Sequence, residues 1–191
     1  MGKLKGTETE KNLLAAFAGE SQARNRYTYF ASVAKKEGYE QIASIFQETA
    51  ENEKEHAKRF FQLLEGGEVE IQAIYPAGVI GNTAQNLEAA ADGELIEWGT
   101  IYKDAAEIAR KEGFTKAAQQ FEEIAKVEKH HEARYRKLLE SINHDSVFNK
   151  EKKVIWQCRN CGYVIEGQRA PNQCPACEHP QAFFQLIADN Y

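Results

Sequence analysis

The sequence lacks the features of several common protein classes. Its 191 residues contain no run of about 18 apolar residues, so no membrane-spanning helix is predicted. The net charge of -5 leaves no basic excess for binding phosphates, which argues against a nucleic-acid partner. The first ten residues are charged and contain no apolar segment typical of a secretory signal. We therefore expect a cytoplasmic protein.

Cysteine is scarce and confined to one segment near the carboxyl terminus. The four cysteines form two Cys-x-x-Cys pairs, Cys158/Cys161 and Cys174/Cys177. In a reducing compartment, this arrangement favours a metal site over two disulfides. The spacing predicts four thiolates around one ion but leaves zinc and iron open, since both accept such ligands. Zinc would be structural, whereas iron could carry one electron.

Four long helical segments are predicted before the cysteines. They extend over residues 7–38, 39–65, 82–113 and 114–142. Short turns join the first to the second and the third to the fourth, while a long segment, 68–81, connects the two pairs. This order is typical of a four-helix bundle with one crossover. A polar stretch over 143–153 predicts a linker between two domains, 1–146 and 147–191. The second is too short to be stable without a metal or another staple.

The two halves of the bundle resemble each other at an offset of 75 residues. Glu53 and His56 match Glu128 and His131. This agreement indicates a duplicated helix pair. In the first and third segments, however, Glu20 falls opposite the residue after Glu94. We hypothesise one extra residue between Glu94 and Tyr102, accommodated as a π-bulge, a feature common at functional sites.

Acidic and imidazole side chains interrupt the apolar stripe of each predicted helix near its middle. The interrupting residues are Glu20, Glu53, His56, Glu94, Glu97, Glu128 and His131. Burying five unpaired carboxylates would cost several kcal/mol each. Two divalent cations would nearly balance their charge. Two Glu-x-x-His motifs, with a glutamate from each remaining helix, form the ligand set of a carboxylate-bridged di-iron or di-manganese bundle.

Two other interpretations concern the same helices. If the helices were rotated so that the acids faced water, several large apolar residues would be exposed together, which makes this arrangement a poorer fit. Tyr27 and Tyr102 lie about two turns from Glu20 and Glu94. They are either core tyrosines with satisfied hydroxyl groups or hydrogen-bond donors to ligating carboxylates.

Together, these motifs resemble the rubrerythrin family over essentially the whole chain. The resemblance implies a mainly α-helical, ferritin-like di-iron bundle followed by a rubredoxin-like domain, and it favours iron in the four-cysteine site, with zinc as a possible substitute. It also implies that Glu53 and Glu128 bridge the two irons. The resemblance further implies that Glu20 and Glu97 bind one iron and that Glu94 and His131 bind the other. His56 would be the residue that exchanges with Glu97.

The resemblance further implies a peroxide reductase active in oxidative-stress defence. Electrons would reach the bundle one at a time through the four-cysteine iron, from reduced rubredoxin or from a reductase dependent on NAD(P)H. A homodimer is expected, with the tail of one subunit contacting the bundle of the other. The expected catalytic residues are His56, Glu97, Tyr27 and Tyr102.

Three other functions remain open at this point. A ferritin-like iron-oxidising or storage protein would use similar ligands, although the fused four-cysteine domain argues against it. A non-enzymatic module would hold zinc in the four-cysteine site and support partner binding. An oxygen-activating hydroxylase would need a pocket for an organic substrate.

Overall fold

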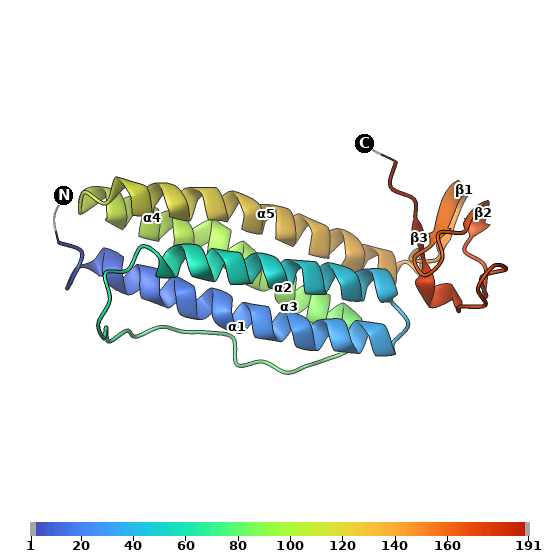
Figure 1. The fold of residues 1–191 in the computed structure, drawn as a ribbon, viewed down its shortest axis with the longest axis horizontal. Coiled ribbons are helices and arrows are strands. Elements are labelled where there is room, and N and C mark those ends of the chain that lie inside the picture. The colour runs from blue at the N-terminus through green and yellow to red at the C-terminus, as the bar shows by residue number, and fades with distance from the viewer. Residues whose placement is uncertain (1–2, 190–191) are drawn as a thin grey trace.

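The computed structural model describes residues 3–189 and consists of a four-helix bundle with a small sheet domain at one end (Figure 1). The outermost residues of the two expected domains, 1–2 and 190–191, lie outside the described residues. The helices are α1 (Glu8–Lys36), α2 (Glu40–Phe61), α3 (Thr83–Ile96), η1 (Glu97–Ile101), α4 (Tyr102–Lys111) and α5 (Thr115–Asn143). The segments α3, η1 and α4 together form the third rod of the bundle. This architecture confirms the predicted fold class.

The helix ends follow local sequence signals. The Thr7 side chain accepts a hydrogen bond from the Glu10 backbone, as a capping threonine should. The Glu10 carboxylate accepts from the Gly6 N–H rather than from Thr7, so the capping box is only partly formed. Gly38 has a φ of +84° after α1, a conformation that favours glycine. The prediction that the second helix extends to Glu65 is wrong, because α2 ends at Phe61 and turns precede Gly66.

The hypothesis of an extra residue in the third rod is confirmed. Residues Glu97–Ile101 form a π-helix, and the N–H of Tyr102 donates to the carbonyl of Glu97 five residues earlier. The corresponding part of the first half lies within α1, an unbroken α-helix. This π-helical segment, Glu97–Ile101, is called the π-turn below. Its extra residue explains why the offset between the two halves is 74 at Glu94 and 75 at Tyr102.

The crossover between α2 and α3 runs along the length of the bundle (Figure 1). It contains no helix or strand over residues 68–82. Tyr75 attaches it to α1 by donating from its hydroxyl to the Ala15 carbonyl at 2.7 Å. Among the helices in the described part of the chain, none is both long and apolar enough to cross a bilayer.

The interior contains two apolar layers on either side of the acidic residues. One layer contains Phe60, Tyr102 and Phe121, and the other contains Tyr27, Phe46 and Tyr135. Each of these side chains is at most 2% exposed. The five carboxylates and two imidazoles lie at the level between the layers. Rotating the helices to expose the acids would expose these rings as well, so the structure excludes that arrangement.

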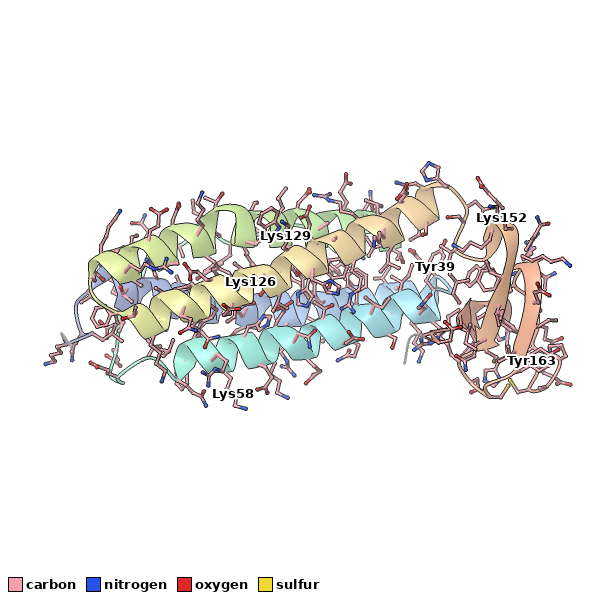
Figure 2. All side chains as sticks on the ribbon, turned by 90° about the horizontal axis from the view of Figure 1, so that it is seen from above. Tyr39, Lys58, Lys126, Lys129, Lys152 and Tyr163 are labelled. Atoms are coloured by element: carbon pink, nitrogen blue, oxygen red, sulfur yellow. The ribbon has the colours of Figure 1, made fainter. Side chains whose placement is uncertain are left out.

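The tail forms a three-stranded antiparallel sheet in the order β2-β1-β3. Its strands are β1 (Asn149–Cys158), β2 (Val164–Arg169) and β3 (Phe184–Leu186). The predicted linker is therefore too long, because β1 begins at Asn149. The ring of Phe148 stacks on Tyr39 at 6.2 Å between ring centres, which joins the tail to the start of α2. Figure 2 shows Tyr39 at this junction and Tyr163 on the side of the tail away from the helices.

Candidate metal centre

The acidic and imidazole residues predicted from the helix stripes converge on two adjoining clusters. The first contains Glu20, Glu53, His56 and Glu128, and the second contains Glu53, Glu94, Glu128 and His131. In each cluster the candidate ligand atoms lie within 4.8 Å of one another. Glu53 and Glu128 belong to both clusters, which is the arrangement expected of carboxylates that bridge two ions.

Both histidines turn Nδ1 toward the shared carboxylates. His56 Nδ1 lies 2.8 Å from Glu53 Oε2 and 2.9 Å from Glu128 Oε1. His131 Nδ1 lies 2.8 Å from Glu128 Oε2 and 3.2 Å from Glu53 Oε1. One ring nitrogen thus faces two different carboxylates in each cluster. This arrangement suits ligands that surround a cation better than simple hydrogen-bonded pairs.

Hydrogen bonding within the described residues leaves many of these atoms without partners. The buried atoms that lack a hydrogen bond include Glu20 Oε2, Glu53 Oε1, Glu94 Oε2, both carboxylate oxygens of Glu128, and His131 Nδ1. Buried polar groups are normally satisfied, and an exception calls for an explanation such as a bound ion. The unpartnered atoms are carboxylate oxygens and an imidazole nitrogen, which are ligands that iron accepts. The residues therefore fit two metal ions.

Burial and mutual repulsion shift the carboxyl groups toward their neutral forms. Burial, followed by the charges of Glu128 and Glu53, raises the pKa of Glu20 well above its usual value. Burial is also the main reason that the pKa of Glu94 is raised, followed by the charge of Glu53 and then that of Glu128. Without metal, these side chains avoid the cost of a buried charge by binding protons.

The pKa values of the two histidines shift upward, whereas burial alone would lower them. Burial alone would lower the pKa of His56, but the nearby carboxylates of Glu128 and Glu53, 2.9 Å and 2.8 Å from Nδ1, raise it to about 10. The same opposition raises the pKa of His131 to about 9. For Glu53, burial is outweighed by the two histidines, which lower its pKa. Protons on the imidazoles thus act as the cations of the metal-free bundle, and metal binding should release them.

The tyrosines predicted near the acids donate to the carboxylates. The Tyr27 hydroxyl donates to Glu94 Oε1 at 2.6 Å, and the Tyr102 hydroxyl donates to Glu20 Oε1 at 2.5 Å. Each bond crosses between α1 and the third rod, and the two are related by the duplication. A donor to one carboxylate oxygen fixes the rotation of the carboxylate and leaves its other oxygen free to bind an ion. Of the two interpretations considered for these tyrosines, the geometry supports the second.

Glu97 is the predicted ligand that the structure does not bring into either cluster. It lies at the first position of the π-turn and is half-buried. Burial, then the charges of Glu128 and Glu53, raise its pKa to about 8, while the charge of Arg26 opposes them. His56 is present in the cluster on the Glu20 side. The role of Glu97 as a ligand that alternates with His56 therefore remains a prediction.

A cavity of about 550 Å³ reaches Glu97 from the surface. It lies between α1, the crossover and the third rod, and Glu97 and Arg26 contribute its charged groups near the π-turn. Most of the lining is apolar and includes Ile74, Ile96 and Ile101. The cavity thus gives small molecules access to Glu97.

The sequence interpretation missed a difference between the two histidines. Asn52 Oδ1 lies 3.3 Å from His131 Nε2 and can accept its proton, fixing the ring with Nδ1 toward the cluster. The residue equivalent to Asn52 in the second half is Val127, which has no polar side chain. His56 is also more exposed, at 12% against 2% for His131. The offset of 75 could have revealed this difference.

The four cysteines of the tail form a compact cluster. Two Sγ–Sγ distances are 3.8 Å for Cys158–Cys177 and 3.6 Å for Cys161–Cys174. Four sulfurs at ~2.3 Å from a tetrahedral ion would lie about 3.8 Å apart, so the cluster fits such an ion. Each Cys-x-x-Cys turn closes in the same way: Gly162 N–H donates to Cys158 O, and Glu178 N–H donates to Cys174 O, both at 2.9 Å. Positive φ at Gly162 and Glu178 completes both turns.

The fold and the two kinds of cluster define a class of protein: a ferritin-like di-iron carboxylate bundle joined to a rubredoxin-like four-cysteine domain. Comparison with known proteins agrees with this definition. The family model described as rubrerythrin matches residues 11–139, and the model of the rubrerythrin rubredoxin-like domain matches residues 156–185. The chain belongs to the rubrerythrin family.

Individual relatives match along nearly the whole chain. A rubrerythrin of Porphyromonas gingivalis is 62% identical over 98% of this chain and 94% of its own length. A rubrerythrin of Nitratidesulfovibrio vulgaris is 53% identical over 100% of both chains. Among solved structures, nigerythrin in a mixed-valence state superposes with a TM-score of 0.62 at 29% identity, covering 97% of this chain and 92% of that one. The match across both domains indicates that they occur together in these relatives.

Proposed function

We propose that this chain reduces hydrogen peroxide to water at a di-iron site in the bundle. The observation that carries the proposal is the pair of clusters sharing Glu53 and Glu128, joined in one chain to a four-thiolate site. Two adjacent irons, when bound, supply the two electrons that convert one peroxide and two protons into two waters. An iron held by the four cysteines would supply the replacement electrons one at a time.

The proposed ligand assignment follows the two clusters. Glu53 and Glu128 would be shared by the two irons, Glu94 and His131 would hold one of them, and Glu20 with either His56 or Glu97 would hold the other. A neutral imidazole suits a ferrous ion and a carboxylate suits a ferric one, so an exchange between His56 and Glu97 would follow the redox state. The contrast between Asn52 and Val127 supports this assignment, because a tethered His131 remains bound while an untethered His56 can leave.

The remaining side chains control protons and access. The hydroxyls of Tyr27 and Tyr102 hold two carboxylates in place while charge at the centre changes. Glu97 lines the cavity, which makes it a candidate to exchange a proton with an incoming peroxide.

Electron delivery is proposed to occur between subunits of a homodimer. Glu53 lies 14 residues from Tyr39, so about 21 Å of helix separates the cluster from the junction with the tail. The tail is placed beyond that junction, with Tyr163 on its far side (Figure 2). Electron transfer weakens steeply over such distances. A tail from a second subunit, contacting the bundle near its middle, would bring the two centres closer.

The upstream donor is proposed to be reduced rubredoxin or a reductase dependent on NAD(P)H. Cys158, Cys161, Cys174 and Cys177 form no disulfide, which supports a reducing compartment and a cytoplasmic location. Iron storage, the alternative function, would make no use of the four-cysteine site.

The cavity beside Glu97 favours a second candidate, an oxygen-activating hydroxylase. Its volume and apolar lining would accommodate a small organic molecule. The two functions differ in the fate of oxygen. Reduction of peroxide sends both of its oxygen atoms to water, whereas a hydroxylase transfers one oxygen atom to an organic product.

The primary test is a stoichiometric reaction under argon. Protein reduced in the bundle should consume one hydrogen peroxide for every two bundle irons and should release water without molecular oxygen. Oxygen evolution, or incorporation of labelled peroxide oxygen into an added organic compound, would contradict the proposal.

Replacing His56 with alanine should leave the bundle irons bound but slow peroxide turnover by on the order of 10- to 100-fold, because the ferrous site loses its replaceable ligand. The measurement is iron content together with stopped-flow oxidation of the reduced site. Asn52→Val provides a matched comparison, since it frees His131 in the way that Val127 leaves His56 free. Unchanged kinetics in His56→Ala would contradict the exchange.

A further inference from the structure

A group of polar side chains outside the metal clusters connects the π-turn to α5. The Trp98 indole N–H donates to Glu132 Oε2 at 3.0 Å. Arg136 donates from Nε to Glu132 Oε1 at 3.3 Å and from a terminal nitrogen to Asp92 Oδ1 at 2.8 Å. Lys129 lies over the Trp98 ring at 5.1 Å from its centre. A chain of contacts thus runs from Asp92, before the turn, through α5 to Trp98, within the turn.

The positions of these residues relate the group directly to the ligands. Asp92 and Trp98 bracket Glu94 and Glu97 in sequence, and Glu132 follows His131 directly. Trp98 is half-buried, and the Glu132 side chain is 17% exposed. Hydrogen bonds that involve a charged group are stronger than neutral ones, and partial burial reduces their screening by water.

The duplication of the bundle provides an internal comparison. In the half without a π-turn, Glu132 corresponds to Ala57 and Arg136 corresponds to Phe61 at the offset of 75. Before the extra residue the offset is 74, and Asp92 then corresponds to Ala18. Glu97 also has no acidic counterpart. The predicted ligands on α5, Glu128 and His131, have counterparts in the first half, Glu53 and His56. The polar group has none, and it occurs only in the half that contains the π-turn and Glu97.

A π-turn needs local support, because π-helical residues make up well under 1% of residues in proteins. We propose that Trp98 and Glu132, completed by Arg136 and Asp92, form a clamp that holds the π-turn and thereby positions Glu97 beside the metal clusters. These are positioning residues, since none of them is in either cluster. This inference rests on the proposed role of Glu97 as a ligand and adds the contacts that position Glu97.

The test combines Trp98→Phe with two variants of Glu132. Phenylalanine keeps an aromatic ring but removes the N–H donor, and Glu132→Leu removes the acceptor. Glu132→Gln keeps one oxygen acceptor for Trp98 but loses the charged contact with Arg136, so its behaviour should lie between wild type and Glu132→Leu. Glu123→Leu is the control, because Glu123 pairs with Lys126 on the exposed surface of the same helix.

Two measurements report on the clamp without relying on enzyme activity. Hydrogen exchange of amides in residues 97–102 should become faster in Trp98→Phe and Glu132→Leu, faster to a smaller extent in Glu132→Gln, and unchanged in Glu123→Leu. The second measurement is a titration of the metal-free protein with Mn²⁺, followed by electron paramagnetic resonance. In Trp98→Phe and Glu132→Leu, the weaker of the two Mn²⁺ sites should bind about 10-fold less tightly than in the wild type. Manganese is chosen because carboxylates bind it more readily than thiolates do.

Equal exchange rates and equal Mn²⁺ affinities in Glu132→Leu and Glu123→Leu would overturn the clamp. If Trp98→Phe does not fold, the comparison of Glu132→Leu with Glu123→Leu is sufficient by itself. Failure of the proposed function is distinguishable, because it shows in a different experiment: a reduced bundle that does not convert peroxide to water contradicts the function, whereas the exchange rates and Mn²⁺ affinities of these variants test the clamp alone.

Discussion

Replacing Glu53 with alanine should empty the bundle of both metal ions while the four-cysteine iron remains. Glu53 belongs to both clusters, so its loss removes a ligand from each ion at once. It also leaves His56 and His131 without one of the carboxylates that each faces. We expect the affinity for the pair to fall by on the order of 100-fold or more, above the range for residues that only orient ligands. Iron analysis after anaerobic reconstitution should fall from about three ions per chain to about one.

A suitable control lies two residues away on the same helix. Glu55 is exposed and pairs with Lys58, so Glu55→Ala removes the same charge from α2 without touching either cluster. This variant should retain all three ions. If Glu53→Ala also retained three ions, the assignment of Glu53 as a bridging ligand would be wrong.

Replacing Cys161 with serine should reduce steady-state peroxide turnover to background. A serine hydroxyl is a poor substitute for a thiolate in a tetrahedral iron site, so the relay to the bundle is lost. The bundle itself is unchanged, and a bundle reduced beforehand should still be oxidised once by peroxide. Stopped-flow absorbance separates the single oxidation from continuous turnover supplied by a reductase or rubredoxin.

The comparison variant is Gln168→Ser, an exposed change on β2 that is not at a cysteine. It should leave both phases of the reaction close to wild type. Normal continuous turnover by Cys161→Ser would show that electrons reach the bundle without the tail, and the fused domain would then need another explanation.

Most of the bundle could be predicted from the sequence because its signals are local. Thr7, Gly38 and Gly113 mark helix boundaries, and the acids interrupt stripes that repeat every three or four residues. The π-turn could be predicted because duplication provides a second copy for comparison. The end of α2 could not be placed, because Gln62–Glu65 are all good helix formers and no stop signal precedes Gly66.

The parts that escaped prediction depend on contacts between distant segments. The bond from Trp98 to Glu132 joins residues 34 positions apart, and that from Asn52 to His131 joins residues 79 apart. Neither has a spacing within one helix that sequence periodicity can detect. The start of β1 at Asn149 was missed for the same reason, because its polar residues become a strand by pairing with β2.

The central claim is that metal ions and protons compete for the same buried acids and imidazoles. The most direct test is calorimetric titration of ferrous iron, under argon, into protein whose four-cysteine site has been filled with zinc beforehand. The titration is repeated at pH 7 in buffers of different ionisation enthalpy. Its end point gives the number of ions bound, and the dependence of the heat on the buffer gives the number of protons released. The raised pKa values of Glu20, Glu94, His56 and His131 predict two ions bound and roughly two to four protons released per chain. Fewer than two ions, or binding without proton release, would contradict the account.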